Sequence, residues 1–306
     1  MINFSKRLKV GTALALLMTG PACAEPAPTA RTATKAVPDS DPALWVLKDA
    51  DTTVYLFGTI HVLKPGLTWF DEAVRDAFDK SDELKLEIVE ADAPTMAALV
   101  QAKGMSLTGP TLTQKLPADG RPALAKYMGE IGLPQQAYDR MRPWLAATYL
   151  QVQSLVKVGY DPQSGPEQVL TKAAKAANKP VSGLETVEQQ IGFFAGLSEK
   201  TQVAMLDETL DEMPKLQTTM GKMVGEWSAG KTDLIAKELN DGITRSPEAM
   251  QVLLTDRNVR WADWIKGRMG QPGTVFIAVG AGHLAGPASV QAELAKRGIK
   301  ATRINY

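Results

Sequence analysis

Two kinds of reactive side chain are scarce in this sequence of 306 residues, which has one cysteine and two histidines. The cysteine, Cys23, falls inside a predicted leader that is removed from the mature chain. Its removal excludes a disulfide framework, a thiolate metal site and a cysteine nucleophile. Any chemistry that uses imidazole therefore depends on His61 and His283.

An excess of positive charge is also absent, because Lys+Arg and Asp+Glu are both 34. Loss of the three basic residues of the leader makes the mature chain mildly acidic. A nucleic-acid backbone is bound by clustered Lys and Arg, so this composition argues against a nucleic-acid partner. After the leader, no apolar run reaches the roughly 20 residues that a membrane helix needs. We therefore expect no membrane span in the mature chain.

The first 24 residues have the pattern of a secretory signal peptide. Residues 6–9 supply a positive segment, residues 10–18 form a short apolar run, and Ala22-Cys23-Ala24 matches a small-x-small cleavage site. This order predicts cleavage after Ala24 and a periplasmic or secreted protein. A lipoprotein acylated at Cys23 is the less favoured alternative, because the residues before the cysteine fit a lipoprotein signal poorly.

The chain after the leader divides into a linker and one folded domain. Residues 25–43 are rich in Pro, Ala and Thr and predict a flexible linker. Residues 44–306 predict a catalytic domain whose β-rich runs lie near its two ends, with helical periodicity between them. The predicted strands are Leu44–Leu47, Thr53–Phe57, Leu84–Val89, Thr274–Val279 and Ala301–Ile304, with a possible short strand at Pro180–Ser182.

The fold class follows from this distribution. We expect an α/β fold in which strands from both chain ends form one mixed β-sheet, packed with helices and a large central helical segment. The predicted helices are Phe70–Lys80, Pro143–Lys157, Pro166–Ala177, Val187–Leu197, Glu199–Val224 with a break at Pro214, Lys231–Leu239, Pro247–Arg268 and Pro287–Arg297.

Both histidines lie in a Gly-x-x-His motif, Gly58 to His61 and Gly280 to His283. Each motif follows a hydrophobic strand and precedes a short loop and a helix. If the two strands are neighbours, both imidazoles lie at the carboxyl edge of the sheet, where α/β sheets place ligands. Imidazole is a common metal ligand, and its pKa also suits proton transfer near neutral pH.

A carboxylate is needed to complete a metal site that has only two histidines. Glu87 is the strongest candidate, because it lies within the apolar strand LKLEIV, where an unpaired carboxylate is costly. Glu90 lies at the end of that strand and is expected to be solvated. The alternative for Glu87 is an exposed position on an edge strand.

A second candidate pair is Arg257-Asn258, in the segment LLTDRNVRWADWI. Helical spacing places Arg257 on an otherwise apolar face, where it could orient a carboxylate or bind an oxyanion. An ordinary surface salt bridge is the alternative. Glu185 is either a ligand or part of a helix start that is capped by Thr186.

These motifs occur in a recognisable order: LFGTIHVLKPG, SDELKLEIVEAD, KPVSGLETVEQQIGFFAGL, LLTDRNVRWADWI, IAVGAGHLAGP and GIKATRI. In this order and spacing, residues 44–306 resemble the TraB/GumN family, which is related to the Tiki proteases and more distantly to the erythromycin-esterase and ChaN group. The resemblance implies that the two Gly-x-x-His motifs act together with a glutamate and an Arg-Asn pair. In this sequence these residues are His61, His283, Glu87, Arg257 and Asn258.

The resemblance also implies a metal-dependent peptidase, with manganese or cobalt favoured and zinc as a further option. His61, His283 and Glu87 would hold the ion, which would activate water and polarise a carbonyl group. Arg257 and Asn258 would stabilise an oxyanion or orient the carboxylate. The substrate would be a peptide or a small molecule.

Two other functions stay open, because the sequence has neither an HExxH helix nor a Gly-x-Ser-x-Gly elbow. One is a metal-free esterase in which one histidine is the general base. The other is a non-catalytic periplasmic protein that binds haem, a metal or a peptide through the same histidines.

N-terminal sequencing of the secreted or periplasmic chain tests the predicted export. Because the small-x-small site ends at Ala24, the mature protein should begin at Glu25. A lipid-modified N-terminus at Cys23, or an intact Met1 in the cytosol, would contradict the prediction.

Overall fold

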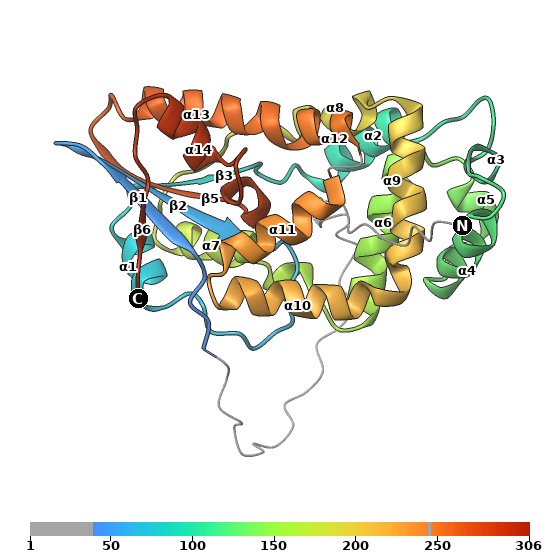
Figure 1. The fold of residues 1–306 in the computed structure, drawn as a ribbon, viewed down its shortest axis with the longest axis horizontal. Helices are drawn as coiled ribbons and strands as arrows, with labels where there is room; N and C mark the ends of the chain where they lie inside the picture. The colour runs from blue at the N-terminus through green and yellow to red at the C-terminus, as the bar shows by residue number, and fades with distance from the viewer. Residues whose placement is uncertain (1–38, 244–245) are drawn as a thin grey trace, which may run out of the picture.

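The computed structural model describes residues 39–243 and 246–306, so the predicted leader and most of the predicted linker lie outside the described residues. Six strands of the described chain form one mixed sheet in the order β4-β3-β5-β2-β1-β6 (Figure 1). Their bounds are Leu44–Lys48 for β1, Thr52–Thr59 for β2, Glu83–Leu86 for β3, Val181–Gly183 for β4, Gly273–Gly280 for β5 and Thr302–Ile304 for β6. The α/β class and the mixed sheet predicted from the sequence are confirmed.

Four consecutive strands of this sheet are parallel. β2 and β5 pair along their whole length, from Thr52 opposite Gly273 to Thr59 opposite Gly280. β3 pairs with the other side of β5, and β4 pairs with β3. β1 is antiparallel to both of its neighbours, β2 and β6. The two strands that precede the Gly-x-x-His motifs are therefore neighbours, and their carboxyl ends meet at one edge.

Helices cover both faces of the sheet (Figure 1). One face packs against α13 (Asp256–Arg268) and α14 (Val290–Lys296), and the other packs against α1 (Glu72–Asp79), α7 (Pro166–Ala176), α10 (Leu216–Ser228) and α11 (Thr232–Ile243). Side chains of β5 alternate between the two cores, with Val275 and Ile277 on the α13 side and Phe276 on the α1 side. β5 is thus buried on both faces, which explains its continuous apolar sequence.

A second group of helices lies beyond the carboxyl ends of the parallel strands, to the right in Figure 1. Its own core includes Trp144, Leu145 and Phe194. The remaining helices are α2 (Ala93–Gly104), α3 (Leu112–Lys115), α4 (Arg121–Glu130), α5 (Gln135–Tyr138), α6 (Pro143–Lys157), α8 (Val187–Gly196), α9 (Glu199–Glu212) and α12 (Pro247–Met250), with the short turns η2 (Pro162–Ser164), η3 (Met213–Lys215), η4 (Gln251–Thr255) and η5 (Ala281–Leu284). The large central helical segment predicted from the sequence is this group together with α7, α10, α11 and α13.

Three elements differ in detail from the sequence prediction. β3 ends at Leu86, so Glu87 directly follows the strand instead of lying inside it. The predicted helix Pro247–Arg268 contains a π-helical turn, η4, between α12 and α13. β4 comes from the middle of the chain, so the sheet is not built from the two chain ends alone.

The start of α7 is packed tightly against the first Gly-x-x-His motif. A Cβ atom on Gly165, the residue before α7, would lie 2.3 Å from the backbone oxygen of His61. This contact fixes the distance between α7 and the loop after β2, and only glycine permits it.

Gly165→Ala should therefore destabilise the fold by about 1–3 kcal/mol, because backbone atoms must move to admit the methyl group. Gly192→Ala is the matched control, since a Cβ on this α8 glycine would meet nothing within 4 Å. That change should stabilise the chain by about 0.5–1 kcal/mol. Urea unfolding followed by far-UV circular dichroism measures both effects, and equal midpoints for the two variants would contradict the packing argument.

Candidate functional site

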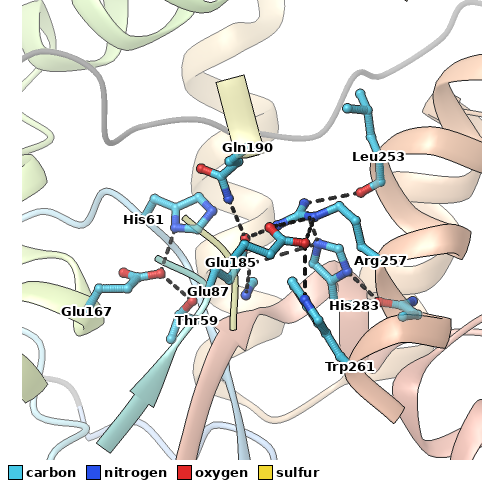
Figure 2. Close-up of polar contacts among 12 residues, drawn as sticks. Thr59, His61, Glu87, Glu167, Glu185, Gln190, Leu253, Arg257, Trp261 and His283 are labelled. Atoms are coloured by element: carbon cyan, nitrogen blue, oxygen red, sulfur yellow. Dashed lines mark hydrogen bonds and ion pairs between the residues drawn. The ribbon is translucent and has the colours of Figure 1, made fainter. Parts of the chain in front are cut away.

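Each of the four parallel strands places one polar residue just beyond its carboxyl end. Glu87 directly follows β3, His61 and Glu185 each follow their strand, β2 and β4, by two residues, and His283 lies in η5 after β5. All four side chains are buried. They meet at the edge of the sheet where α/β proteins bind ligands, as Figure 2 shows.

Three of these side chains converge on one point above Gly280. A Cβ atom on that glycine would lie 3.1 Å from Glu87 Oε1, 3.6 Å from His61 Nε2 and 3.7 Å from His283 Cδ2. The backbone N–H of Gly280 also donates a hydrogen bond to Glu87 Oε1 at 2.7 Å. The predicted grouping of the two histidines with Glu87 is thus present in the structure.

His61 is held by a carboxylate that the sequence analysis did not single out. His61 Nδ1 lies 2.6 Å from Oε1 of Glu167, in the first turn of α7, and the Thr59 hydroxyl donates to the same oxygen at 2.5 Å. A carboxylate accepts hydrogen bonds only, so Nδ1 carries a proton and Nε2 faces the point above Gly280. Burial alone would lower the pKa of His61, but Glu167 outweighs it and raises that pKa to about 9.

His283 is held by the predicted partner Asn258. The Asn258 amide nitrogen donates to the Ala288 carbonyl at 2.7 Å, which leaves Oδ1 to accept from His283 Nδ1 at 2.6 Å. The Nε2 atom of His283 therefore bears a lone pair, and it accepts from Arg257 Nη1 at 3.1 Å. Burial and the nearby guanidinium lower the pKa of His283 to about 3, so the ring is neutral.

Arg257 connects the remaining groups of the site (Figure 2). Its Nε and Nη2 atoms donate to the two oxygens of Glu185 at 2.8–3.1 Å, and Nη2 also donates to Glu87 Oε2 at 2.5 Å. Trp261 donates to Glu185 Oε1 at 3.1 Å and packs against the ring of His283. Burial tends to raise the pKa of Glu87, but Arg257 and both histidines outweigh it and hold that pKa well below its usual range.

The buried charges are balanced only when His61 is protonated. Glu87, Glu167 and Glu185 are three buried carboxylates, whereas Arg257 is the buried guanidinium between two of them. Arg260 reaches Glu185 from the surface, at 3.7 Å. With His61 neutral, the centre keeps excess negative charge, which attracts a further cation.

These residues fit a divalent metal ion in the kind and charge of their donor atoms. In both histidines, Nδ1 donates a hydrogen bond to a side-chain oxygen, which fixes the orientation of the ring. This arrangement is typical of histidines that ligate a metal through the other nitrogen. In residues 39–243 and 246–306, however, no three His, Cys, Asp or Glu side chains stand close enough to hold an ion as they are. Arg257 also occupies the lone pair of His283 Nε2 and one oxygen of Glu87. The ligand set of His61, His283 and Glu87 stays a prediction, and His283 can join it only if Arg257 releases it.

The structure brings together the five residues predicted from the sequence, and it adds others. Glu185, left open between a ligand and a helix start, is the bidentate partner of Arg257, and Thr186 caps α8 as expected. Glu90 is exposed, and its carboxylate accepts a hydrogen bond from the Gln168 side chain. Residues missed by the sequence analysis are Thr59, Glu167, Gln190 and Trp261.

Among the missed residues, Gln190 had a clear signal in the sequence. It shares one face of α8 with the buried residues Val187, Ile191 and Phe194, so a polar side chain there needs a buried partner. That partner is Glu87 Oε2, at 3.0 Å. Glu167 had no such signal, because an acidic residue in the first turn of a helix is ordinary.

The fold and site define an α/β protein with a buried histidine–carboxylate centre at its sheet edge. The sequence model of the TraB/PrgY/gumN family matches residues 43–303, and the chain belongs to that family. It is also 24% identical over 268 residues to an uncharacterized protein of Treponema pallidum (strain Nichols), covering 83% of this chain and 80% of that protein. No solved structure matches the chain. None of the described helices is both long and apolar enough to span a membrane.

In the metal-free chain, the raised pKa of His61 should make stability fall above neutral pH. The folded pKa is about 9 against 6.5 for an unperturbed histidine, so the folded chain binds the proton more tightly. This stabilisation is fully present below the unfolded pKa and is lost as the pH rises through the folded pKa, a change of about 3 kcal/mol. Urea unfolding in EDTA across this pH range measures it.

Two histidine variants separate this effect from general alkaline destabilisation. His61→Gln should remove the decline, because the titrating group is absent. His283→Gln should keep it, because the low pKa of His283 places its own titration far below this range. A decline of equal size in His61→Gln would show that other groups cause it.

Proposed function

We propose that this chain is an exported, metal-dependent hydrolase of the peptidase type, with its site at the carboxyl edge of the parallel strands. The observation that carries the proposal is the convergence of His61 Nε2, Glu87 Oε1 and the His283 ring above Gly280. Two imidazoles and a carboxylate are a frequent donor set for catalytic divalent ions. Export is supported by the leader pattern of the first 24 residues.

A bound divalent ion would supply an activated water molecule and polarise a substrate carbonyl. The protein residues do the remaining work. Glu167 and Asn258 orient the two imidazoles, and the low pKa of Glu87 keeps this carboxylate ionised as a ligand. Arg257 Nη1 donates to His283 Nε2, and once that contact is released for metal binding the same N–H would be available to negative charge that develops on the substrate.

The test combines metal analysis with turnover, using the mature chain without a polyhistidine tag. The protein is equilibrated in turn with manganese, cobalt and zinc, and its metal content is measured after dialysis. We expect stoichiometric metal and metal-dependent cleavage in an unspecific peptide pool, abolished by EDTA and restored by the ion. Bound metal or haem without turnover would favour the binding-protein alternative. Ester cleavage without metal would favour the metal-free esterase.

Four substitutions should give a distinct pattern. His61→Ala and His283→Ala should each remove metal and activity, and both variants should still fold but with lower stability, because each change leaves a buried partner, Glu167 or Asn258, without its hydrogen bond. Glu87→Gln keeps the shape but removes the charge, so metal affinity should fall. Arg257→Lys should keep metal and lose activity about 100-fold, because lysine cannot reproduce the forked contact.

Arg260→Lys is the matched control for Arg257→Lys, because Arg260 lies on the same helix but is exposed. It should retain both metal and rate. Circular dichroism decides whether each variant is folded, and unfolding of the histidine variants would assign those residues a structural role. Full metal content with unchanged turnover in all four site variants would refute the proposed function.

A further inference from the structure

The two histidines have matching sequence motifs but different partners. His61 Nδ1 faces a carboxylate oxygen of Glu167 at 2.6 Å, whereas His283 Nδ1 faces the carboxamide oxygen of Asn258 at 2.6 Å. An anionic partner makes an imidazole a stronger electron donor through its other nitrogen. The two halves of the site are therefore chemically unequal, and Glu167 is the origin of the difference.

Glu167 is held in place independently of the histidine. It lies in the first turn of α7, where the positive end of the helix dipole favours a carboxylate. The Thr59 hydroxyl donates to the same oxygen that faces His61, at 2.5 Å. The close packing of Gly165 on the His61 backbone sets the spacing between α7 and the loop. Glu167 is thus a fixed, buried acceptor.

We propose that Glu167 is the positioning residue of His61: by accepting the Nδ1–H hydrogen bond it fixes the tautomer and ring orientation that present Nε2 to the point above Gly280. The consequence of this positioning of His61 for metal binding rests on the proposed function. Without an acceptor at Nδ1, a neutral imidazole can carry its proton on Nε2, where no lone pair is then left for a ligand. The described hydrogen bonds join the Glu167 side chain to Thr59 and His61, so it acts on the centre through His61.

Nitrogen-15 NMR of the imidazoles tests this directly, because the chain has only two histidines. The mature, metal-free protein is used with a tag that contains no histidine, and His283→Ala assigns the two sets of signals. The wild type should show a slowly exchanging, downfield Nδ1–H proton for His61. At a pH above the pKa of His61, the ring should be the Nδ1–H tautomer.

Glu167→Leu removes the acceptor at nearly constant volume. The downfield His61 signal should disappear and the tautomer should shift toward Nε2–H, while the His283 signals stay unchanged in the same spectrum. Glu167→Gln should restore the Nδ1–H tautomer with a less downfield proton, because the amide oxygen still accepts. Glu90→Gln, a matched change at an exposed neighbour of α7, should have no effect.

An Nε2–H tautomer in the wild type, or a His61 signal that is unchanged in Glu167→Leu, would overturn the proposal. If Glu167→Leu does not fold, Glu167→Gln and Thr59→Val test the proposal instead. Each of these two changes must shift the His61 Nδ1–H signal and leave the His283 signals unchanged.

Zinc titration adds a second measurement. Glu167→Leu should weaken binding about 10- to 100-fold, as loss of such a partner does, with Glu167→Gln in between. Failure of the wild type to bind metal would refute the proposed function, while the NMR result would still decide the role of Glu167.

Discussion

The burial of the Arg257 guanidinium is the constraint on which the rest of the site depends. A buried cation is tolerated only with full pairing, and the loss of one partner of a buried ion pair costs about 3–5 kcal/mol. Arg257 obtains its partners from two different strand ends, Glu87 after β3 and Glu185 after β4. Its side chain also reaches His283 after β5. One side chain of α13 thus ties together the ends of three strands, and the relative positions of these strands cannot change without leaving a charge unpaired.

The parallel register of the strands brings together site residues that are far apart in the sequence. β2 and β5 are separated by more than two hundred residues, yet they pair so that Thr59 lies opposite Gly280. The residues that follow the two strands therefore start from the same height in the sheet. Gly280 keeps the space above its Cα open, because a methyl group there would lie 3.1 Å from Glu87 Oε1. In the second Gly-x-x-His motif, the need for this open space thus explains why the first residue is glycine.

The sequence could predict the elements whose signal is periodic and local. The helix Pro143–Lys157 has those bounds in the structure, and the strands before both Gly-x-x-His motifs are as expected. The end of β3 could not be predicted, because the alternation of LKLEIV continues past Leu86, whereas the pairing with β5 and β4 stops there. Five site residues could be named because histidine, buried charge and the Arg-Asn pair stand out in their surroundings. Glu167 could not, because its role is set by the packing of α7 on a loop about a hundred residues earlier in the chain.

The different charges of the two histidine partners explain how one centre can hold neutral and charged groups together. Near Arg257, His283 is kept neutral by a carboxamide partner, so no second positive charge is placed beside the guanidinium. On the other side of Gly280, His61 faces Glu167, and the positive charge that the three carboxylates require can be accommodated there. A proton on His61 meets that requirement in the absence of other cations. A metal ion at Nε2 would meet it equally well and would displace the proton, so proton and metal compete for the same lone pair. The affinity of the site for a metal should therefore depend on the electrostatics that raise the pKa of His61, and these originate mainly in a residue that need not touch the ion.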